Sequence, residues 1–209
     1  MKIKNLRVGL VGLFGFSLLL LALPAFAGAP TEQTRATVDK VLSILNNQEL
    51  RSPTRANERR DQLRAAIKSR FDFTEMAKRS LGSQWSRHSP QEQQEFIRLF
   101  TELLENSYLD QIESYNGEKI TYGRENLDKD YAEVLTKVVS KKGEEFSVNY
   151  NLHSANGEWK VYDVVIENIS LVNNYRSQFS RILAKSSFDE LLKKLDAKTP
   201  EITGVKTRG

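Results

Sequence analysis

The sequence predicts an α+β fold in which helices come first, an antiparallel sheet of four strands or slightly more follows, and further helices end the chain. Three observations predict it. Apolar residues recur at three- and four-residue steps from Val38 to Ile112, and they alternate with polar residues between Ile120 and Leu152. Helical spacing then returns from Leu171 to Leu195. We expect about six helices and a single domain over residues 28–197.

The first 27 residues have the composition of an export signal. Three cations stand before residue 8, an apolar run continues to Leu23, and Ala25-Phe26-Ala27 supplies the small residues that a signal peptidase accepts. We therefore predict a signal peptide over residues 1–27 and an exported mature chain that starts at Gly28. Because the apolar run is near the short limit for a bilayer span, an uncleaved anchor is the alternative.

Charge and cysteine content narrow the function further. The predicted signal peptide carries three positive charges, so its removal lowers the net charge from +4 to +1. That small charge argues against a nucleic-acid partner. The chain has no cysteine, which excludes disulfides, thiol catalysis and lipid attachment through a cysteine. The fold must be held by packing alone.

The expected helices of the first half end at identifiable signals. We expect them over residues 38–45, 63–71, 72–81 and 90–116. Asp72 can cap the third of these helices, and Gly82 can end it. Ser89-Pro90-Gln91-Glu92 combines a capping serine, a proline at the first helical position and a glutamate that completes a capping box. This last helix carries a wide apolar stripe, so we expect more than one neighbour to bury it.

Four strands are expected around residues 120–122, 134–138, 146–152 and 159–166. Asn156-Gly157 is a strong signal for a two-residue type I′ turn between the last two strands. An unbroken register from that turn pairs Leu152 with Val161, Tyr150 with Asp163 and Val148 with Val165. Two helices over residues 171–183 and 187–195 follow, and the polar residues 198–209 are expected to be a disordered tail.

Few residues suit catalysis. His88 precedes a helix cap and His153 ends a strand beside a turn, so both are interpreted as surface residues. Asp163 is the one acid that the predicted register places on an apolar strand face. A raised pKa would let it act as a base, but a structural acid paired with Tyr150 or Arg176 is the favoured interpretation. We predict no enzymatic activity, no metal and no cofactor.

Basic residues crowd the segment between residues 51 and 70, which contains only two acids. These are Arg51, Arg55, Arg59, Arg60, Arg64, Lys68 and Arg70. Either they form a solvated helix face, or they dock anionic lipid head groups or an acidic partner. The sequence leaves these two alternatives open.

Several ordered strings resemble one known family. These are Phe71-Asp72-Phe73, Leu81-Gly82-x-x-Trp85, Trp159-Lys160-Val161-Tyr162-Asp163-Val164 and Asn174-Tyr175-Arg176-x-Gln178-Phe179. Together they resemble the MlaC family of periplasmic phospholipid-binding proteins, also called the toluene-tolerance auxiliary family. The resemblance extends from about Val38 to Leu195, nearly the whole predicted mature chain.

The resemblance implies a twisted antiparallel sheet wrapped by helices, with acyl chains in an apolar cavity between them. It implies a monomeric periplasmic carrier that maintains outer-membrane lipid asymmetry. The implied partners are a glycerophospholipid, an inner-membrane ABC transporter with its substrate-binding ring, and an outer-membrane lipoprotein complex. An exported enzyme that uses Asp163, and a protein-binding adaptor with a filled core, are the alternatives.

The residues expected to contact lipid are apolar or aromatic and come from both halves of the chain. They are Met76, Leu81, Trp85, Phe100, Leu104, Tyr108, Phe146, Val148, Tyr150, Leu152, Trp159, Val161, Val165 and Tyr175.

Overall fold

The computed structural model describes residues 30–197, so the predicted signal peptide and C-terminal tail lie outside the described residues. The helices are α1 (Pro30–Asn46), α2 (Ala56–Arg70), α3 (Phe73–Leu81), α4 (Pro90–Glu113), α5 (Leu171–Leu183) and α6 (Phe188–Asp196). Three short 3₁₀ helices, Glu49–Arg51, Pro53–Arg55 and Gly82–Arg87, connect some of them. The strands are β1 (Lys119–Asp128), β2 (Tyr131–Val139), β3 (Glu145–Ala155), β4 (Glu158–Ile166) and β5 (Ile169–Ser170). The α+β prediction is confirmed.

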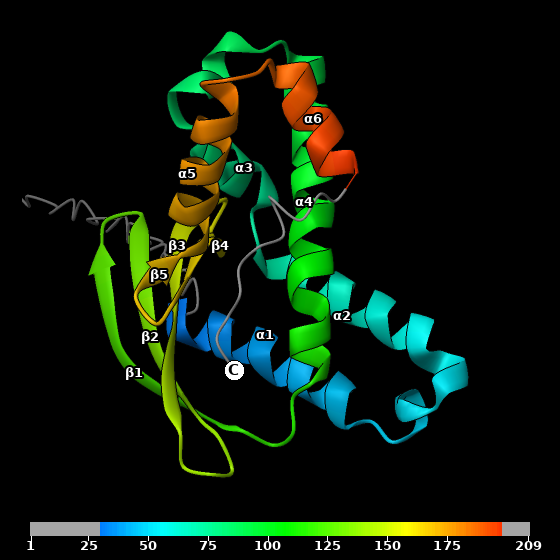
Figure 1. Cartoon of the computed structure of the whole chain (residues 1–209). Helices are drawn as coiled ribbons and strands as arrows, with labels where there is room; N and C mark the ends of the chain where they lie inside the picture. Colours follow the sequence, from blue (N-terminus) through cyan, green and yellow to red (C-terminus); the bar gives the residue numbers. More distant parts are fainter. Residues whose placement is uncertain (1–29, 198–209) are drawn as a thin grey trace, which may run out of the picture.

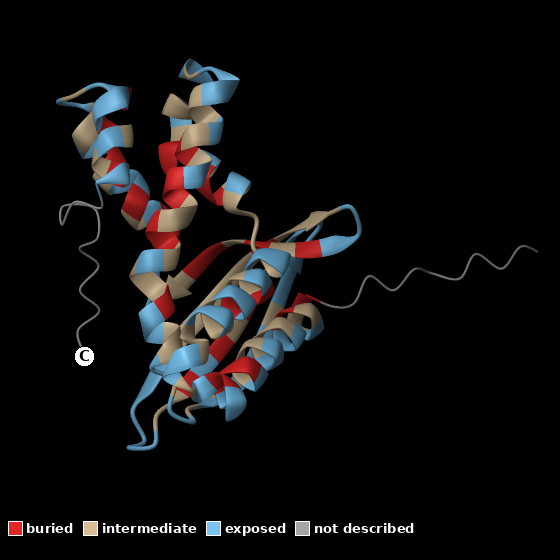
Figure 2. Cartoon of the chain, turned by 90° about the vertical axis from the view of Figure 1, so that its right-hand side faces the viewer, coloured by how far each residue is buried: buried red, intermediate tan, exposed pale blue. Residues whose placement is uncertain are grey.

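The five strands form one antiparallel sheet in the order β1-β2-β3-β4-β5. Figure 1 shows that α1 lies against the sheet, whereas α5, α6 and the first half of α4 extend beyond it. Coloured by burial, Figure 2 shows α1 and α2 side by side next to the strands. The helices therefore fall into one group beside the sheet and one group above it.

The predicted caps are present. The Ser89 side chain accepts from the backbone N–H of Glu92, and the Glu92 side chain accepts from the Ser89 backbone, so α4 begins with a complete capping box. Asp72 caps α3 in the same way by accepting from Glu75 N–H. At the β3–β4 turn, Asn156 and Gly157 both have positive φ, as a type I′ turn requires.

Three apolar clusters hold the helices and the sheet together. The helical core joins α3, α4, α5 and α6 around Phe96, Phe100 and Phe179. The sheet-side cluster consists of the buried residues Ala132, Val134, Leu152, Trp159, Val161, Val164 and Leu171. A third cluster joins α1 and α2 to the end of α4 around Leu63 and Leu109.

Arg70 ties the first two helices to the sheet. Its Nη1 donates to the Trp159 carbonyl at 2.6 Å and to Gln33 Oε1 at 2.7 Å, and that same oxygen accepts from Trp159 N–H at 2.9 Å. The end of α2, the start of α1 and the edge of β4 thus meet at one guanidinium. These bonds also occupy polar backbone groups at the start of β4.

We expect Arg70→Ala to lower the free energy of unfolding by about 2 kcal/mol, because it leaves a strand carbonyl and an amide oxygen without their charged donor. Chemical denaturation, monitored by circular dichroism, measures this loss of stability. Arg55→Ala is the matched control, since Arg55 makes only exposed ion pairs with Glu49 and Glu58. An equal midpoint for the two variants would contradict the role given to Arg70.

Candidate functional site

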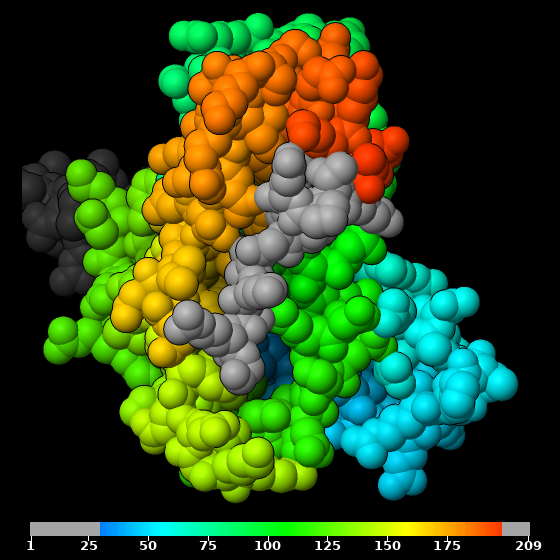
Figure 3. Space-filling view, viewed as in Figure 1, coloured from blue at the N-terminus to red at the C-terminus, as the bar shows by residue number. Residues whose placement is uncertain are grey.

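The candidate site is the space between the inner face of the sheet and the helices. Tyr122, Val148, Tyr150 and Ile166 point from the sheet toward this space, yet they are only half-buried. Close backbone packing joins α4 to α3 and α6, and α4 reaches the sheet-side cluster through the Tyr108 side chain. Figure 3 shows the surface recessed between the strands and α4, with α1 visible at the bottom of the recess. We call this space the groove.

A β-bulge decides which β4 residues face the groove. Leu152 pairs with Val161 as predicted, but Asn151 pairs with Asp163, so Tyr162 is an extra residue in β4. From there Tyr150 pairs with Val164 and Val148 pairs with Ile166. The unbroken register, with Tyr150 opposite Asp163 and Val148 opposite Val165, is therefore wrong.

The bulge reverses the two faces of β4 beyond Val161. Val164 and Ile166 now join the sheet-side cluster, while Asp163 and Val165 lie on the other face. The prediction that placed Val165 on the same face as Val148 is wrong for this reason. Ile166 occupies the position beside the groove instead. The only sequence signal for it is the alternation of apolar residues along β4, read with a shift of one residue.

The structure divides the predicted lipid contacts between two clusters. The helical core contains Met76, Leu81, Phe100, Leu104 and Tyr175, with Trp85 packed against it. The sheet-side cluster contains Leu152, Trp159 and Val161, with Val148 and Tyr150 packed against it. Tyr108 packs against both clusters. Phe146 is 38 % exposed, and neither it nor Val165 belongs to either cluster.

Besides Ile166, three further residues beside the groove are not among the expected lipid contacts. Phe71 packs against both clusters, and its backbone forms a parallel bridge with Val161. Tyr122 and Val164 also contact the sheet-side cluster. The string Phe71-Asp72-Phe73 was already part of the resemblance, but nothing in its spacing placed Phe71 against a strand.

Tyrosines supply the polar atoms around the groove. Loss of solvent raises the pKa of Tyr150 to about 12, and it also raises the pKa values of Tyr108 and Tyr122. Each phenol therefore stays protonated and neutral at physiological pH. Solvent is largely excluded from these three phenols.

Asp163 has a structural role at the start of α5. Its Oδ1 accepts from Val172 N–H at 3.0 Å, and its Oδ2 accepts from the Ser170 hydroxyl at 2.6 Å. Both carboxylate oxygens are thus occupied at a helix N-terminus, where negative charge is favoured. The structural interpretation is supported, but Ser170 and Val172 replace the expected partners Tyr150 and Arg176.

Both histidines have partners. His153 Nε2 lies 3.0 Å from Asp72 Oδ2, and the His88 ring stacks on Phe188 with 3.6 Å between the ring centroids. Their side chains are 21 % and 15 % exposed, so both histidines reach the surface but are partly buried by these contacts. Within residues 30–197, no group of three or more His, Asp or Glu side chains is arranged to hold a metal ion.

The basic segment forms ion pairs with α4. Arg60 Nη2 lies 2.6 Å from Asp110, and Arg59 Nη2 lies 2.7 Å from Glu113. One and two turns further along α2, Arg64 and Lys68 both pair with Glu105. These contacts favour a helix-to-helix role for the segment over a free docking surface.

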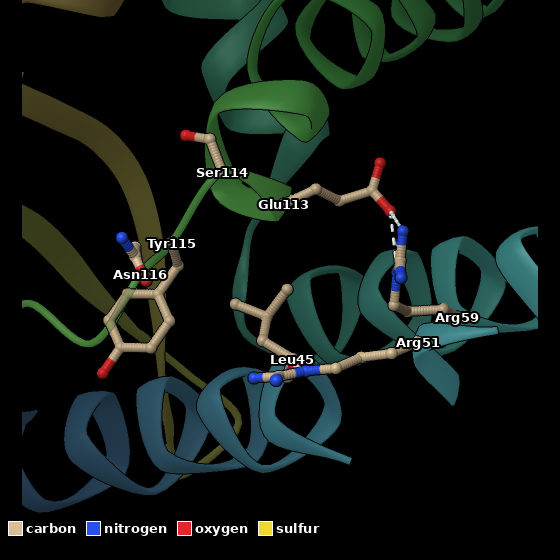
Figure 4. A pocket seen from close by; sticks show the side chains of 7 residues that line it. All are labelled: Leu45, Arg51, Arg59, Glu113, Ser114, Tyr115 and Asn116. Carbon is tan, nitrogen blue, oxygen red and sulfur yellow. Dashed lines mark hydrogen bonds and ion pairs between the residues drawn. The ribbon is translucent and has the colours of Figure 1, made fainter. Parts of the chain in front are cut away.

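A polar pocket of about 320 Å³ lies where α1 and α4 end (Figure 4). Arg51, Arg59, Glu113 and Asn116 contribute its polar lining, together with Leu45, Ser114 and Tyr115. Figure 4 shows the Arg59 guanidinium directed at the Glu113 carboxylate. None of the expected lipid contacts lines this pocket, and its polar walls do not suit acyl chains.

No helix within residues 30–197 has both the length and the apolar composition needed to cross a bilayer.

Two relatives and one solved structure resemble the chain. Toluene tolerance protein Ttg2D of Pseudomonas putida is 28 % identical over 207 residues, which cover 98 % of this chain and 94 % of the relative. The intermembrane phospholipid transport system binding protein MlaC of Haemophilus influenzae is 27 % identical over 120 residues, which cover 55 % of this chain and 56 % of the relative. A phospholipid-binding protein from Ralstonia solanacearum, solved in complex with a phospholipid, aligns with a TM-score of 0.72 and 25 % identity. The alignment covers 82 % of this chain and 97 % of that one.

The family description "MlaC protein" matches residues 35–197, which include most of α1 and every later helix and strand to α6. The match includes both walls of the groove, and its extent agrees with the fold shared with the Ralstonia protein. This chain belongs to the MlaC protein family.

Proposed function

We propose that this protein is a periplasmic phospholipid carrier that shelters acyl chains in the groove. The observation that carries the proposal is a set of half-buried apolar side chains that pack against the sheet-side cluster and border the groove. They are Val148, Tyr150 and Ile166 from the sheet and Tyr108 from α4. Large apolar side chains usually bury themselves against one another. Their incomplete burial inside the fold suits an apolar ligand that completes the packing.

A carrier of this kind solves a solvation problem. Two acyl chains contain roughly 30 methylenes, and exposing them to water costs about 0.8 kcal/mol each, or on the order of 25 kcal/mol together. A groove lined by aliphatic and aromatic side chains can accept the chains from a bilayer with little net change in free energy. The carrier therefore lowers a barrier, and the direction of transfer comes from its partners.

Those partners are the finer part of the proposal. We expect a monomer that exchanges glycerophospholipid with an inner-membrane ABC transporter and its substrate-binding ring, and with an outer-membrane lipoprotein complex. The name of the Haemophilus relative, which places that protein in an intermembrane phospholipid transport system, supports this assignment. No catalytic step is needed for such exchange, and the bonds made by Asp163 support a structural role for that acid.

The test is to purify the mature protein, extract it with organic solvent and identify the released lipids by mass spectrometry. We expect about one phospholipid per protein molecule, and reloading of delipidated protein from phospholipid vesicles. Protein that carries no lipid and takes none from vesicles would support the protein-binding adaptor instead.

A further inference from the structure

Three buried hydroxyls lie where α4 meets α5, and none of them has a hydrogen-bond partner among the described residues. They are Ser107 Oγ and Tyr108 Oη from α4, and Tyr175 Oη from α5. The Tyr175 side chain is fully buried. Buried polar groups in proteins are nearly always paired, so three unpaired hydroxyls at one junction call for an explanation.

The three hydroxyls are neighbours. After burial, which is the largest cause, Tyr175 helps to raise the pKa of Tyr108. Ser107 and Tyr108 act on the pKa of Tyr175 in the opposite direction to burial and lower it. Hydrogen bonding among these hydroxyls is one of the causes of the two pKa shifts, so the three lie within reach of one another, but no pair has both the distance and the angles of a formed hydrogen bond. The Tyr175 ring is held between Phe100 and Phe179, with centroids 5.4 Å and 5.7 Å away, which restricts its freedom to turn toward another partner.

The junction borders the groove. Tyr108 packs against both the helical core and the sheet-side cluster, so its side chain lies on the boundary between the two. A ligand in the groove therefore reaches the Tyr108 side chain directly, and Tyr175 and Ser107 lie next to it. Tyr108 thus places a buried hydroxyl on this boundary, and the Tyr175 hydroxyl lies behind it in the helical core.

The chemistry of the junction selects a neutral acceptor. Burial raises the pKa of both tyrosines, so each phenol keeps its proton and can donate it. Among the described residues, no lysine or arginine contributes to the pKa of either tyrosine. A phosphate buried here would lack a cation, whereas a carbonyl oxygen needs only a donor.

We propose that the hydroxyls of Tyr108 and Tyr175, with that of Ser107, donate hydrogen bonds to the ester carbonyl oxygens of a diacyl lipid. The inference rests on the proposed lipid-carrier function and adds to it the part of the ligand that is recognised. The esters mark the point where the acyl chains begin, so these bonds set how deeply the chains enter the groove. Lipids with ether-linked chains lack the carbonyl oxygens and bind more weakly.

The test compares two phosphatidylethanolamines that have identical chain lengths, one with ester and one with ether linkages. Delipidated protein is incubated with vesicles that contain both in equal amounts, and the bound lipids are counted by mass spectrometry. We expect the native protein to take up the ester lipid in about fivefold excess, the factor that one net hydrogen bond provides. Tyr108→Phe and Tyr175→Phe should each reduce the excess, and together they should bring the ratio close to one.

Tyr131→Phe is the matched control, because Tyr131 is 47 % exposed and packs with Tyr162, away from the sheet-side cluster. It should keep the native ratio. A ratio near one for the native protein overturns the proposal even if the variants fail to fold. An unchanged ratio in the double variant overturns it as well and assigns the hydroxyls to buried water. Failure of the native protein to bind either lipid would instead refute the carrier function itself.

Discussion

Val148→Glu is expected to reduce lipid loading more than 100-fold while the protein stays folded. Val148 lies on β3 opposite Ile166, half-buried, on the face that borders the groove. Without ligand, the new carboxylate can be hydrated. An acyl chain in the groove would strip that water from a charged group, which costs several kcal/mol and opposes binding. Phospholipid content after purification and uptake from vesicles measure the loss.

Val165→Glu is the matched control, since Val165 is half-buried like Val148 but faces the other side of the sheet beyond the bulge. We expect it to keep native lipid loading. Equal loss of lipid loading in both variants would contradict the assignment of Val148 and Val165 to opposite faces of the sheet. Native loading in Val148→Glu would place the lipid elsewhere in the protein. Circular dichroism at matched concentration checks that both variants are folded.

Local signals predicted the elements of this fold well, because each depends on a few adjacent residues. The capping box at Ser89 and Glu92 specifies the start of α4, and Asn156-Gly157 specifies the β3–β4 turn. The two-residue strand β5 was not predicted, since Ile169-Ser170 is too short to show alternation. The predicted helix at residue 38 in fact begins at Pro30, where polar residues conceal the helical period.

The bulge at Tyr162 could not be predicted from periodicity. The segment from Trp159 to Ile166 contains no glycine and no proline to mark a bulge, and apolar residues stand on both of its faces, so both registers satisfy the pattern. The choice depends on long-range contacts. With Tyr162 as the extra residue, Arg79 of α3 stacks over its ring at 4.0 Å and Asp163 reaches the start of α5.

Apolar spacing also could not separate the two clusters that hold the predicted lipid contacts. Phe100 and Leu152 are equally apolar and equally buried, yet one lies in the helical core and the other on the sheet. The spacing of the basic residues likewise could not show which acidic residues they pair with. Glu105 is 41 residues from Arg64 and Glu113 is 54 residues from Arg59, so these acidic partners become neighbours only through helix packing.

The second large effect is expected for Asp163→Ala, which should lower the free energy of unfolding by about 3 kcal/mol. The substitution removes the acceptor of the Val172 N–H and of the Ser170 hydroxyl, and it removes the negative charge at the start of α5. Thermal melting should show a decrease of roughly 6–12 °C in the midpoint. Since α5 carries Tyr175 and Phe179 into the helical core, the loss should extend to the whole domain.

Two comparisons make this prediction specific. Asp163→Asn keeps an oxygen for the Val172 N–H but loses the charge, so it should fall between native protein and Asp163→Ala. Asp61→Ala removes an acid whose side chain is 73 % exposed and that pairs only with Arg64 within α2, so it should leave the midpoint unchanged. An Asp163→Ala variant as stable as the native protein would show that the helix cap is dispensable. The buried carboxylate would then need another explanation, and the enzyme hypothesis would regain its candidate base.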